Sequence, residues 1–494
     1  MCGIAGSFKE SAPEKVELML SQITHRGPDG QGIKNFPNGT LGHTRLAILD
    51  IDGGHQPMGF GDIWIAFNGE IYNYRELAKE YLTDIQLTTH SDTEVIVHLY
   101  RKFGPKCLNL LRGMFAFAII QGEELFLARD LIGIKPLYCG EHDGIFYFAS
   151  EIKALAQVTD EIREFPAGHW YHSNSGWHCY EEISASLIDV HNEQEASELI
   201  HNRLEEAVRM RLISDVPIGI SLSGGLDSSI IAKLASQFTE HLHSFAVGME
   251  GSEDLKAARK MANILETRHY ERIYTEKEMV DILPKVIYHL ESFDPALVRS
   301  AIPNYFLAEM ASQQVKVILT GEGADEVYAG YDYLSQYTNP DLLQKELASI
   351  TNSLHNTNLQ RADRVAMAFG LEARVPFLDI HSINLGLGLP PELKVHHHHT
   401  AKYLLRLAFK RDLPEEIANR PKQKFSKGAG SSDVLAQLAN RTITDKEYQS
   451  ERARLLYQWN YRLPNKEALY YYQILCQYFQ DRWIFPTMGR SRSL

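Results

Sequence analysis

Cysteine stands at position 2, directly behind the initiator methionine, in the opening sequence MCGIAGSF. Removal of Met1 leaves Cys2 with a thiol and a free α-amine in the same residue. Only the thiolate attacks carbon, and a thiol with a pKa near 8.5 is mostly protonated at neutral pH. An α-amine, with a pKa of about 7.7 to 8.0, is the nearest base for that proton. The pattern predicts an amino terminus that activates its own nucleophile, although a lone second-position cysteine is more often a small residue in an edge strand.

Segments farther along supply the other groups that a reaction at an amide needs. HRGPDG is a tight Gly/Pro turn bracketed by charges, and GHTRLAILD carries Arg45 beside a strand. NGEIYNY places Asn68, Gly69 and Glu70 at a strand end, and SDTEV adds a second carboxylate, Asp92. Together these segments provide an anion-binding arginine, amide donors and two carboxylates.

Cys2-Gly-Ile with these segments resembles the class II glutamine amidotransferase domain, an N-terminal-nucleophile hydrolase of the α+β class built as an αββα sandwich. The resemblance implies that Cys2 attacks glutamine to give a thioester and ammonia, and that water then releases glutamate. It implies that the Asn68 side chain and the Gly69 amide form the oxyanion hole, which serves the tetrahedral intermediate. The implied glutamine-binding residues are Arg45 for the α-carboxylate, Glu70 and Asp92 for the α-ammonium, and Leu46, Ile48, Asn68 and Gly69.

A second motif, SLSGGLDSS, follows an apolar segment and precedes a helical pattern. Glycine permits close backbone approach, and the N–H groups at a helix end face an anion. The motif lacks the lysine of G-x-x-x-x-G-K-[ST], so it is not the ordinary ATPase loop. Acidic residues follow a later strand in TGEGADE, and Mg²⁺ prefers carboxylate and phosphate oxygens. The alternative interpretations are a Ser/Gly turn with a serine helix cap and a solvated acidic turn.

The strand, loop and helix resemble the pyrophosphate loop of ligases that cleave ATP to AMP. On this resemblance Asp227 and Asp325 are candidate Mg²⁺ ligands. Glu322 is the candidate for positioning or deprotonating at the reacting carboxylate, and Lys402 is expected to stabilise the departing pyrophosphate. The residues expected to bind ATP and pyrophosphate are Leu222, Ser223, Gly224, Gly225, Asp227, Ser228, Val247, Thr320, Gly321 and Lys402.

The two constellations in this order, with LEARVPFLD between the acidic segment and Lys402, resemble glutamine-dependent asparagine synthetases across nearly the whole chain. The resemblance implies that ammonia travels internally to β-aspartyl-AMP, giving asparagine, glutamate, AMP and pyrophosphate. Arg299 is the expected acceptor-binding residue, but Ala296 and Leu297 stand where the family has threonines. A lost hydroxyl matters where a site must pair a polar group of the substrate. Another carboxylate, such as a sugar acid or a natural-product acid, is therefore the alternative acceptor.

Two further classes of function fit parts of the pattern. A ring-closing ligase related to β-lactam or peptide cyclases would use a substrate amine and keep the glutaminase as a relic, yet Cys2, Arg45, Asn68 and Asp92 are intact. A non-catalytic binding or regulatory protein would show a decayed site, and nothing central is missing. The run from His396 to His399, natural or engineered, is expected to be an exposed loop.

The elements that position these residues divide the chain in two. Up to about residue 155, short alternating apolar segments with glycines between them predict antiparallel sheet with a few helices. Apolar segments at 217–222, 242–249 and 314–321 alternate with helical patterns, which predicts a parallel, doubly wound α/β sheet with ligands at the carboxyl ends of its strands. From about residue 341 the pattern is mainly helical. We expect a glutaminase domain at residues 2–185 and a synthetase domain at residues 195–485.

The totals of the sequence narrow the function further. A chain of 494 residues is too long for a single hydrophobic core, so two domains are expected. A formal net charge of -13 and a pI near 5.9 disfavour nucleic-acid and anionic-membrane partners, while bound ATP stays compatible. Five cysteines without C-x-x-C spacing argue against a disulfide framework or a zinc site. Since the sequence shows no signal peptide and no apolar span, we expect a cytoplasmic enzyme. The resemblance to asparagine synthetases implies that it forms a homodimer.

Overall fold

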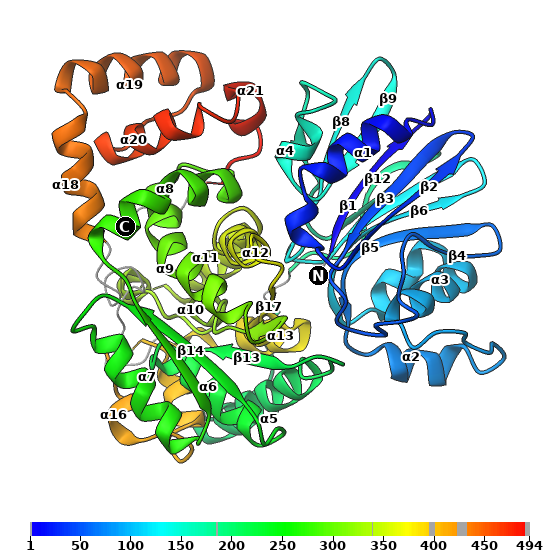
Figure 1. The fold of residues 1–494 in the computed structure, drawn as a ribbon. Helices are drawn as coiled ribbons and strands as arrows, with labels where there is room; N and C mark the ends of the chain where they lie inside the picture. The colour runs from blue at the N-terminus through cyan, green and yellow to red at the C-terminus, as the bar shows by residue number, and fades with distance from the viewer. Residues whose placement is uncertain (1, 184–185, 338, 395–400, 422–431, 490–494) are drawn as a thin grey trace.

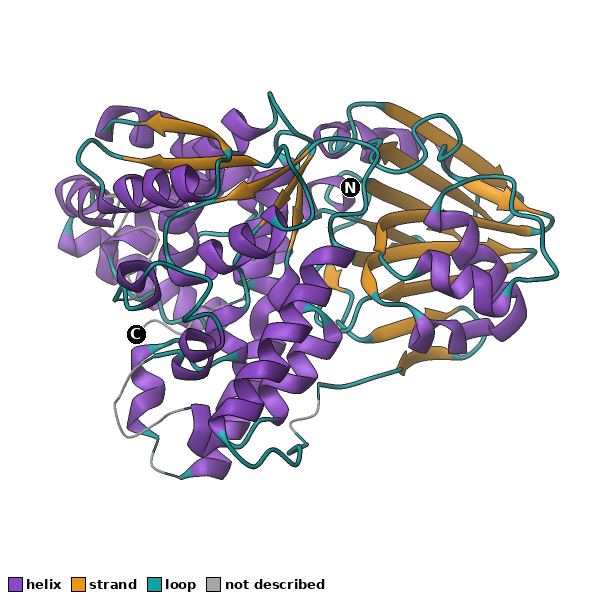
Figure 2. Ribbon diagram, turned by 90° about the horizontal axis from the view of Figure 1, so that it is seen from below, coloured by secondary structure: helices purple, strands orange, loops and turns teal. Residues whose placement is uncertain are grey.

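The computed structural model describes residues 2–489 apart from 184–185, 338, 395–400 and 422–431. Figure 1 shows two units side by side, one rich in strands and one in which helices surround a smaller sheet. We call residues 2–179 the amino-terminal sandwich and residues 193–489 the carboxy-terminal unit. Figure 2 shows the same separation from below. No helix in the described part of the chain has the length and apolar character to cross a membrane.

The amino-terminal sandwich consists of two six-stranded antiparallel sheets with the orders β10-β8-β9-β1-β3-β2 and β12-β11-β7-β6-β5-β4. Helices α1 and α4 pack on the first sheet and α3 on the second, with α2 beside α3. This αββα arrangement confirms the predicted fold class. The strands are β1 Gly3–Phe8, β2 Gly30–Phe36, β3 Gly39–Arg45, β4 Met58–Phe60, β5 Ile63–Ile71, β6 Gly113–Gln121, β7 Glu124–Arg129, β8 Tyr138–His142, β9 Ile145–Ala149, β10 Arg163–Glu164, β11 His169–His172 and β12 Gly176–Cys179. The helices are α1 Pro13–Ser21, η1 Thr24–Arg26, α2 Tyr74–Tyr81, α3 Asp92–Phe103, η2 Gly104–Leu110 and α4 Ile152–Leu155.

Alternation along β1 explains how one strand serves two layers. Ile4 packs in the cluster between the sheets, whereas the next residue, Ala5, packs with Val16 and Met19 of α1. Successive side chains of a strand point to opposite faces, so a strand buried on both sides reads as a continuous apolar run. Strand β1 pairs with β3 on one side and β9 on the other. It is therefore an interior strand, which contradicts the alternative interpretation of Cys2 as part of an edge strand.

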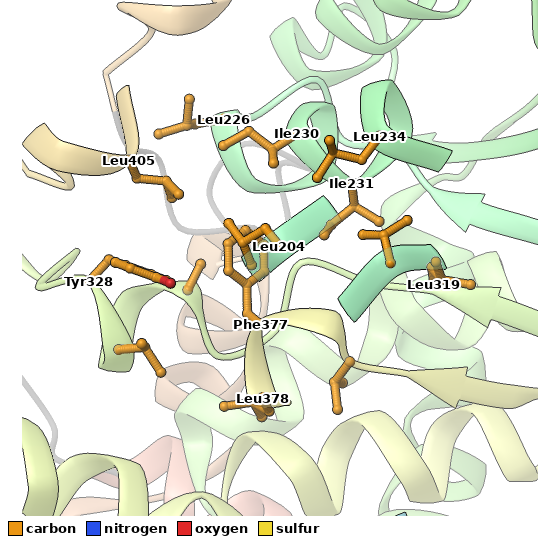
Figure 3. Close-up of a cluster of buried hydrophobic side chains, with 14 of the residues drawn as sticks. Leu204, Leu226, Ile230, Ile231, Leu234, Leu319, Tyr328, Phe377, Leu378 and Leu405 are labelled. Atoms are coloured by element: carbon orange, nitrogen blue, oxygen red, sulfur yellow. The ribbon is translucent and has the colours of Figure 1, made fainter. Parts of the chain in front are cut away.

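The carboxy-terminal unit contains a five-stranded parallel sheet of order β15-β14-β13-β16-β17. Helices lie on both of its faces. Leu204 of α5 and Ile230 of α6 pack on one face with Leu319 of β16, as Figure 3 shows. Leu283 of α8 and residues of α9 and α12 pack on the other. The parallel sheet and the helical carboxy-terminal region confirm the predicted class. The strands are β13 Ile218–Ser221, β14 His243–Gly248, β15 Arg268–Ile273, β16 Val317–Leu319 and β17 Glu372–Arg374.

The helices of this unit run from Glu193 to Ile484. Thirteen residues separate the end of β12 at Cys179 from the start of helix α5 at Glu193, and Asn192 is the N-cap of α5. The helices are α5 Glu193–Met210, α6 Leu226–Ser236, α7 Glu253–Ile264, α8 Glu276–Leu290, α9 Pro295–Ala311, α10 Ala324–Val327, η3 Asp332–Gln336, α11 Pro340–Asn352, η4 Ser353–Asn356, α12 Asn358–Met367, η5 Pro376–Leu378, α13 Ile380–Gly388, α14 Pro391–Lys394, α15 Tyr403–Ala408, α16 Glu415–Ala418, α18 Ser432–Thr442, α19 Asp445–Trp459, α20 Lys466–Leu475 and α21 Asp481–Ile484.

Strands β15 and β17 form the two edges of the parallel sheet and were not expected from the sequence. Their residues read RHYERI and EAR, which are too polar and, for β17, too short to give an apolar strand pattern. In β17 the polar side chains are nevertheless fully buried, because Glu372 and Arg374 pair with each other. An ion pair thus substitutes for the apolar residues that usually mark a buried strand.

Buried ion pairs also join the two units. The guanidinium of Arg26, fully buried, donates to Asp363 of α12 over 2.8 and 3.2 Å, and to Glu151 of the sandwich over 2.7 Å. Arg112 of the sandwich pairs with Asp379 at 2.8 Å. Buried charges need partners that compensate for lost hydration. These contacts therefore favour a single orientation of the two units.

Replacement of Asp363 by asparagine leaves the buried Arg26 guanidinium with one counter-charge fewer. We expect a loss of about 3–5 kcal/mol, the usual cost of breaking a buried pair from one side, seen as a lower thermal midpoint in calorimetry. The control is Lys316→Gln, which breaks the partly exposed interface pair with Asp29 at 2.7 Å and is expected to cost at most about 1 kcal/mol. Equal midpoints for the two variants would contradict the prediction.

Candidate active site

Cys2 lies immediately before β1, and Arg26, which binds the Cys2 carbonyl oxygen, also binds Asp363 of the other unit. Its main-chain nitrogen donates to Oδ1 of Asn68 over 3.1 Å, and its sulfur lies 4.0 Å from the carbonyl oxygen of Leu46. Nε of Arg26 donates to the Cys2 carbonyl oxygen over 3.0 Å. Burial raises the pKa of the Cys2 thiol, while the positive charge of the amino terminus lowers it. The sulfur is thus held in a dry site where a neighbouring base decides its ionisation.

Asn68 and Gly69 lie side by side near the end of β5. Since Oδ1 of Asn68 accepts from Cys2, its Nδ2 is the group left to donate, and this buried atom finds no hydrogen-bond partner among the residues that the structure describes. A Cβ on Gly69 would come within 2.1 Å of the Met114 carbonyl oxygen, so only glycine fits there. An uncommitted, buried amide beside a thiol is what an oxyanion hole needs.

Arg45 ends β3 and is 7% exposed. Its guanidinium donates to the carbonyl oxygens of Asp50 over 2.6 Å and Ile51 over 2.8 Å. These acceptors are neutral, so they fix the side chain without cancelling its charge. Leu46 and Ile48 follow it and are buried. The arrangement leaves Arg45 able to attract a carboxylate.

Two carboxylates of the predicted set, Glu70 of β5 and Asp92 at the start of α3, are both buried. Ser91 caps α3 by accepting from the Thr93 amide, and Asp92 accepts from the Ile71 amide over 2.8 Å. Burial raises the pKa of Asp92 to about 6 and that of Glu70 well above its usual value. Both groups are deprived of water and of a full counter-charge, so a ligand ammonium would be strongly stabilised there.

The second set of predicted residues surrounds a cavity of about 410 Å³ at the carboxyl ends of β13 and β16. The loop after β13 turns through Gly224, whose φ of +67° favours glycine and whose Cβ would come within 2.5 Å of Ala257 main chain. Ser223 and Ser228 hydroxyls lie 3.0 Å apart and close the loop onto the first turn of α6. Glycine backbone and a helix amino end together form an anion-binding surface. The predicted residues that line this cavity are Ser223, Gly225, Asp227, Ser228, Arg299, Thr320, Gly321, Glu322, Asp325 and Lys402.

Lys402 joins the loop to the acidic segment. Its Nζ lies 2.5 Å from Asp227 and 2.7 Å from Asp325. Burial lowers the pKa of the Lys402 ammonium, but the two carboxylates outweigh burial and hold the pKa above its ordinary value. The lysine therefore stays charged at one end of the cavity.

The remaining predicted residues make different contacts. Glu322 pairs with Arg361 of α12, and burial raises the pKa of Glu322 with support from Asp325. Arg299 of α9 lines the cavity and donates through Nε to Glu467 of α20 over 2.7 Å. Glu322 and Arg299 are thus each paired with an oppositely charged residue from a helix that is distant in sequence.

Three residues predicted to bind nucleotide do not line the cavity. Leu222 and Val247 are buried in the hydrophobic clusters on the two faces of the sheet. Gly224 forms the turn of the loop and lies against Ala257 rather than in the cavity lining. Their predicted contact with ATP stays a prediction. The run from His396 to His399 lies outside the described residues.

Two family models divide the chain between them. Residues 1–176 match the glutamine amidotransferase domain, and residues 199–348 and 335–463 match asparagine synthase. The chain is 38% identical to asparagine synthetase B (glutamine-hydrolyzing) of Escherichia coli strain K12 over 99% of the chain and 92% of that relative. It is 38% identical to the probable asparagine synthetase (glutamine-hydrolyzing) of Schizosaccharomyces pombe, over 97% of the chain and 94% of that relative. The chain belongs to the asparagine synthase family.

This asparagine synthase family member also contains cavity residues that the motifs did not reveal. Arg361 pairs with Glu322, and Arg420 donates to Asp254 over 2.7 Å and to the Ser223 carbonyl oxygen over 3.4 Å. Both arginines come from helical or irregular segments without a recognisable motif. Arg361 stands in NLQRADRVAM and Arg420 in EEIANRPKQK, and an arginine in such a mixed or polar segment is too common to single out.

The carboxylates of the first site predict that glutamine binding to this family member weakens in acid. Below the pKa of about 6, Asp92 becomes neutral and loses its attraction for an α-ammonium. Calorimetric titration of glutamine into a Cys2→Ala variant, which binds without reacting, should show affinity falling up to about tenfold per pH unit below pH 6. Asp92→Asn should bind more weakly at pH 7 and show a smaller pH dependence, to which Glu70, whose pKa is also raised, still contributes. Affinity that stays constant from pH 6.5 to 4.5 would refute the assignment.

Proposed function

We propose that this chain converts aspartate, glutamine, ATP and water into asparagine, glutamate, AMP and pyrophosphate. One observation carries the proposal: a buried cysteine beside an uncommitted amide donor occurs in the same molecule as a glycine loop facing a lysine-bridged pair of carboxylates. The first arrangement suits release of ammonia from an amide, and the second suits transfer from ATP. The relatives' names favour aspartate as the acceptor. We assign residues 2–185 to the glutaminase and 195–485 to the synthetase.

In the proposed first reaction, the Cys2 sulfur bonds to the amide carbon of glutamine while its proton passes to the α-amine exposed by removal of Met1. The carbonyl oxygen becomes an oxyanion that accepts from Asn68 Nδ2 and the Gly69 amide. Breakage of the C–N bond, with return of the proton to nitrogen, releases ammonia and leaves a thioester. Water then adds, the C–S bond breaks, and glutamate departs with the thiol restored. Arg45 holds the α-carboxylate, and Glu70 and Asp92 hold the α-ammonium.

In the proposed second reaction, an aspartate carboxylate oxygen bonds to the α-phosphorus of ATP as the bond to pyrophosphate breaks. Loop amides near Ser223 and Gly225 and the Lys402 ammonium stabilise the negative charge of the leaving group. Ammonia then bonds to the acyl carbon, the C–O bond to AMP breaks, and the proton lost by the nitrogen passes to Glu322 or to solvent. Activation is necessary because a carboxylate is a poor electrophile.

A route for ammonia is suggested by the inner end of the cavity. Val365 and Ala366 of α12, with Leu371 and Ala373 beside and within β17, line it and are apolar. On the other side of β17 lies the amino-terminal site, since Arg374 approaches Glu70 at 3.6 Å. An apolar passage excludes water and keeps ammonia unprotonated. This supports internal transfer over release to solvent.

Mg²⁺ fits the donor set of the second site. Asp227 and Asp325 converge on one ammonium, so their oxygens lie close to a common point. No group of three or more metal-ligating side chains occurs within the described ranges, and Mg²⁺ is commonly held by one or two carboxylates together with substrate phosphates. When bound with ATP, the ion would neutralise phosphate charge. The cytoplasm, favoured by the five free thiols, and assembly into a homodimer are further parts of the proposal.

Replacement of Cys2 by alanine tests the division of labour between the sites. We expect glutamine-dependent asparagine formation to fall by at least 10³-fold because the nucleophile is lost, while formation from added ammonium salts stays within about twofold of the unaltered chain. Amino-acid analysis of the product measures both. Loss of the ammonia-dependent reaction as well would refute separate sites, and retention of the glutamine-dependent reaction would refute the role of Cys2.

Acceptor choice follows from pyrophosphate release with ATP, glutamine and a panel of acids. We expect aspartate to stimulate release at least tenfold more than any sugar acid or other amino acid in the panel, because Arg299 lines the cavity. Mass spectrometry of the acyl-adenylate identifies the activated acid. Stimulation by another acid, with none by aspartate, would transfer the assignment to the alternative acceptor.

A further inference from the structure

Strand β17 of the carboxy-terminal unit separates the two sites. Leu371 and Ala373 line the synthetase cavity, whereas Glu372 and Arg374 are fully buried and do not line it. Alternate residues of a strand point to opposite faces. The two charged side chains therefore face away from the cavity, towards the amino-terminal sandwich.

Arg374 connects Glu372 to the glutamine site. Its Nε donates to Glu372 over 2.5 Å, and its terminal nitrogen lies 3.6 Å from Oε1 of Glu70. It also donates to the carbonyl oxygens of Arg211 and Ile213 over 2.7 Å each, which fixes the guanidinium in place. One cation thus stands between two carboxylates, bonded to Glu372 and only loosely paired with Glu70.

The two carboxylates beside Arg374, Glu70 and Glu372, have pKa values shifted in opposite directions. Burial raises the pKa of Glu70, and the neighbouring Glu372 raises it further. Glu372 also raises the pKa of Asp92. Burial acts on Glu372 too, but the charges of the amino terminus, Arg374 and Lys135 lower its pKa to about 2. Glu372 is therefore the ionised partner that occupies Arg374.

We propose that Glu372 is a positioning residue for glutamine hydrolysis: by binding Arg374 it leaves the Glu70 carboxylate free to hold the α-ammonium of glutamine. This inference rests on the proposed function of the first site. Without the Glu372 charge, Glu70 becomes the counter-ion of Arg374 and its attraction for a ligand ammonium is cancelled. The glutamine site is accordingly completed by the carboxy-terminal unit.

The variant Glu372→Gln keeps the shape of the side chain and removes its charge. We expect the KM for glutamine to rise roughly ten- to hundredfold, the effect of losing a charge-assisted contact, with kcat within about twofold. Ammonia-dependent asparagine synthesis is expected to stay within twofold, because Glu372 does not line the synthetase cavity. Glu372→Asp retains the charge and is expected to raise KM about two- to threefold. Should Glu372→Gln fail to fold, Glu372→Asp is measured in its place.

Glu291→Gln is the matched control, since Glu291 is also a buried interface carboxylate, accepting from the Ile152 and Lys153 amides over 3.1 and 2.8 Å. It is expected to leave the KM for glutamine within twofold. A second measurement uses glutaramate, which is glutamine without its α-amino group. In the Cys2→Ala background, Glu372→Gln should weaken glutamine binding at least tenfold and glutaramate binding less than twofold.

Equal weakening of both ligands, an unchanged KM for glutamine, or parallel loss of the glutamine- and ammonia-dependent reactions would overturn the inference. The first and third results assign Glu372 a purely structural role, and the second assigns it none in glutamine binding. Failure of the proposed function is distinguishable, because the unaltered chain would then release no glutamate from glutamine.

Discussion

The buried guanidinium of Arg26 is the contact on which the architecture depends. It holds the carbonyl of Cys2, the proposed nucleophile, and the carboxylates of Glu151 and Asp363 at once. A guanidinium without solvent is costly unless every donor finds an acceptor. Asp363 comes from the other unit, so the acceptors are complete only when the units are docked. Placement of the nucleophile and placement of the second unit are therefore one constraint.

Other buried polar contacts also connect the two units. Glu291 caps the amides at the start of α4, and Arg364 reaches Glu291 at 3.1 Å. Asp379 accepts from Arg112 of one unit and Arg211 of the other. Directional contacts of this kind specify orientation more sharply than apolar packing, which tolerates sliding. The proposed internal transfer of ammonia depends on a fixed orientation of the two units.

Much of the molecule follows from local sequence patterns. Glycine loops and alternating apolar segments report on structure within a few residues, and they predicted β13, α6 and both sheet classes. Cys2 and Asn68 are 66 positions apart, yet motif resemblance brought them together. The contacts of Glu372 and Arg374 were out of reach. Their burial is visible only once β17 is an edge strand pressed against another unit, because in sequence they resemble a solvated charged turn.

The cavity shows the same limit. Lys402 and Asp227 are 175 residues apart and were both expected from family resemblance. Arg361 and Arg420 were missed, since an arginine is usually a surface residue. Only the packing of α12 turns Arg361 inward, towards Glu322 and the cavity. Pairings between distant segments depend on the whole set of contacts, which a short window of sequence does not contain.

The interior position of β1 has a consequence for biosynthesis. Ala5 pairs with Ala149 of β9, so the first strand cannot complete its sheet until roughly 150 residues have left the ribosome. Before β9 has been synthesised, β1 has only β3 available as a partner in this sheet. The strand that follows Cys2 therefore gains its second neighbour late in synthesis of the amino-terminal sandwich.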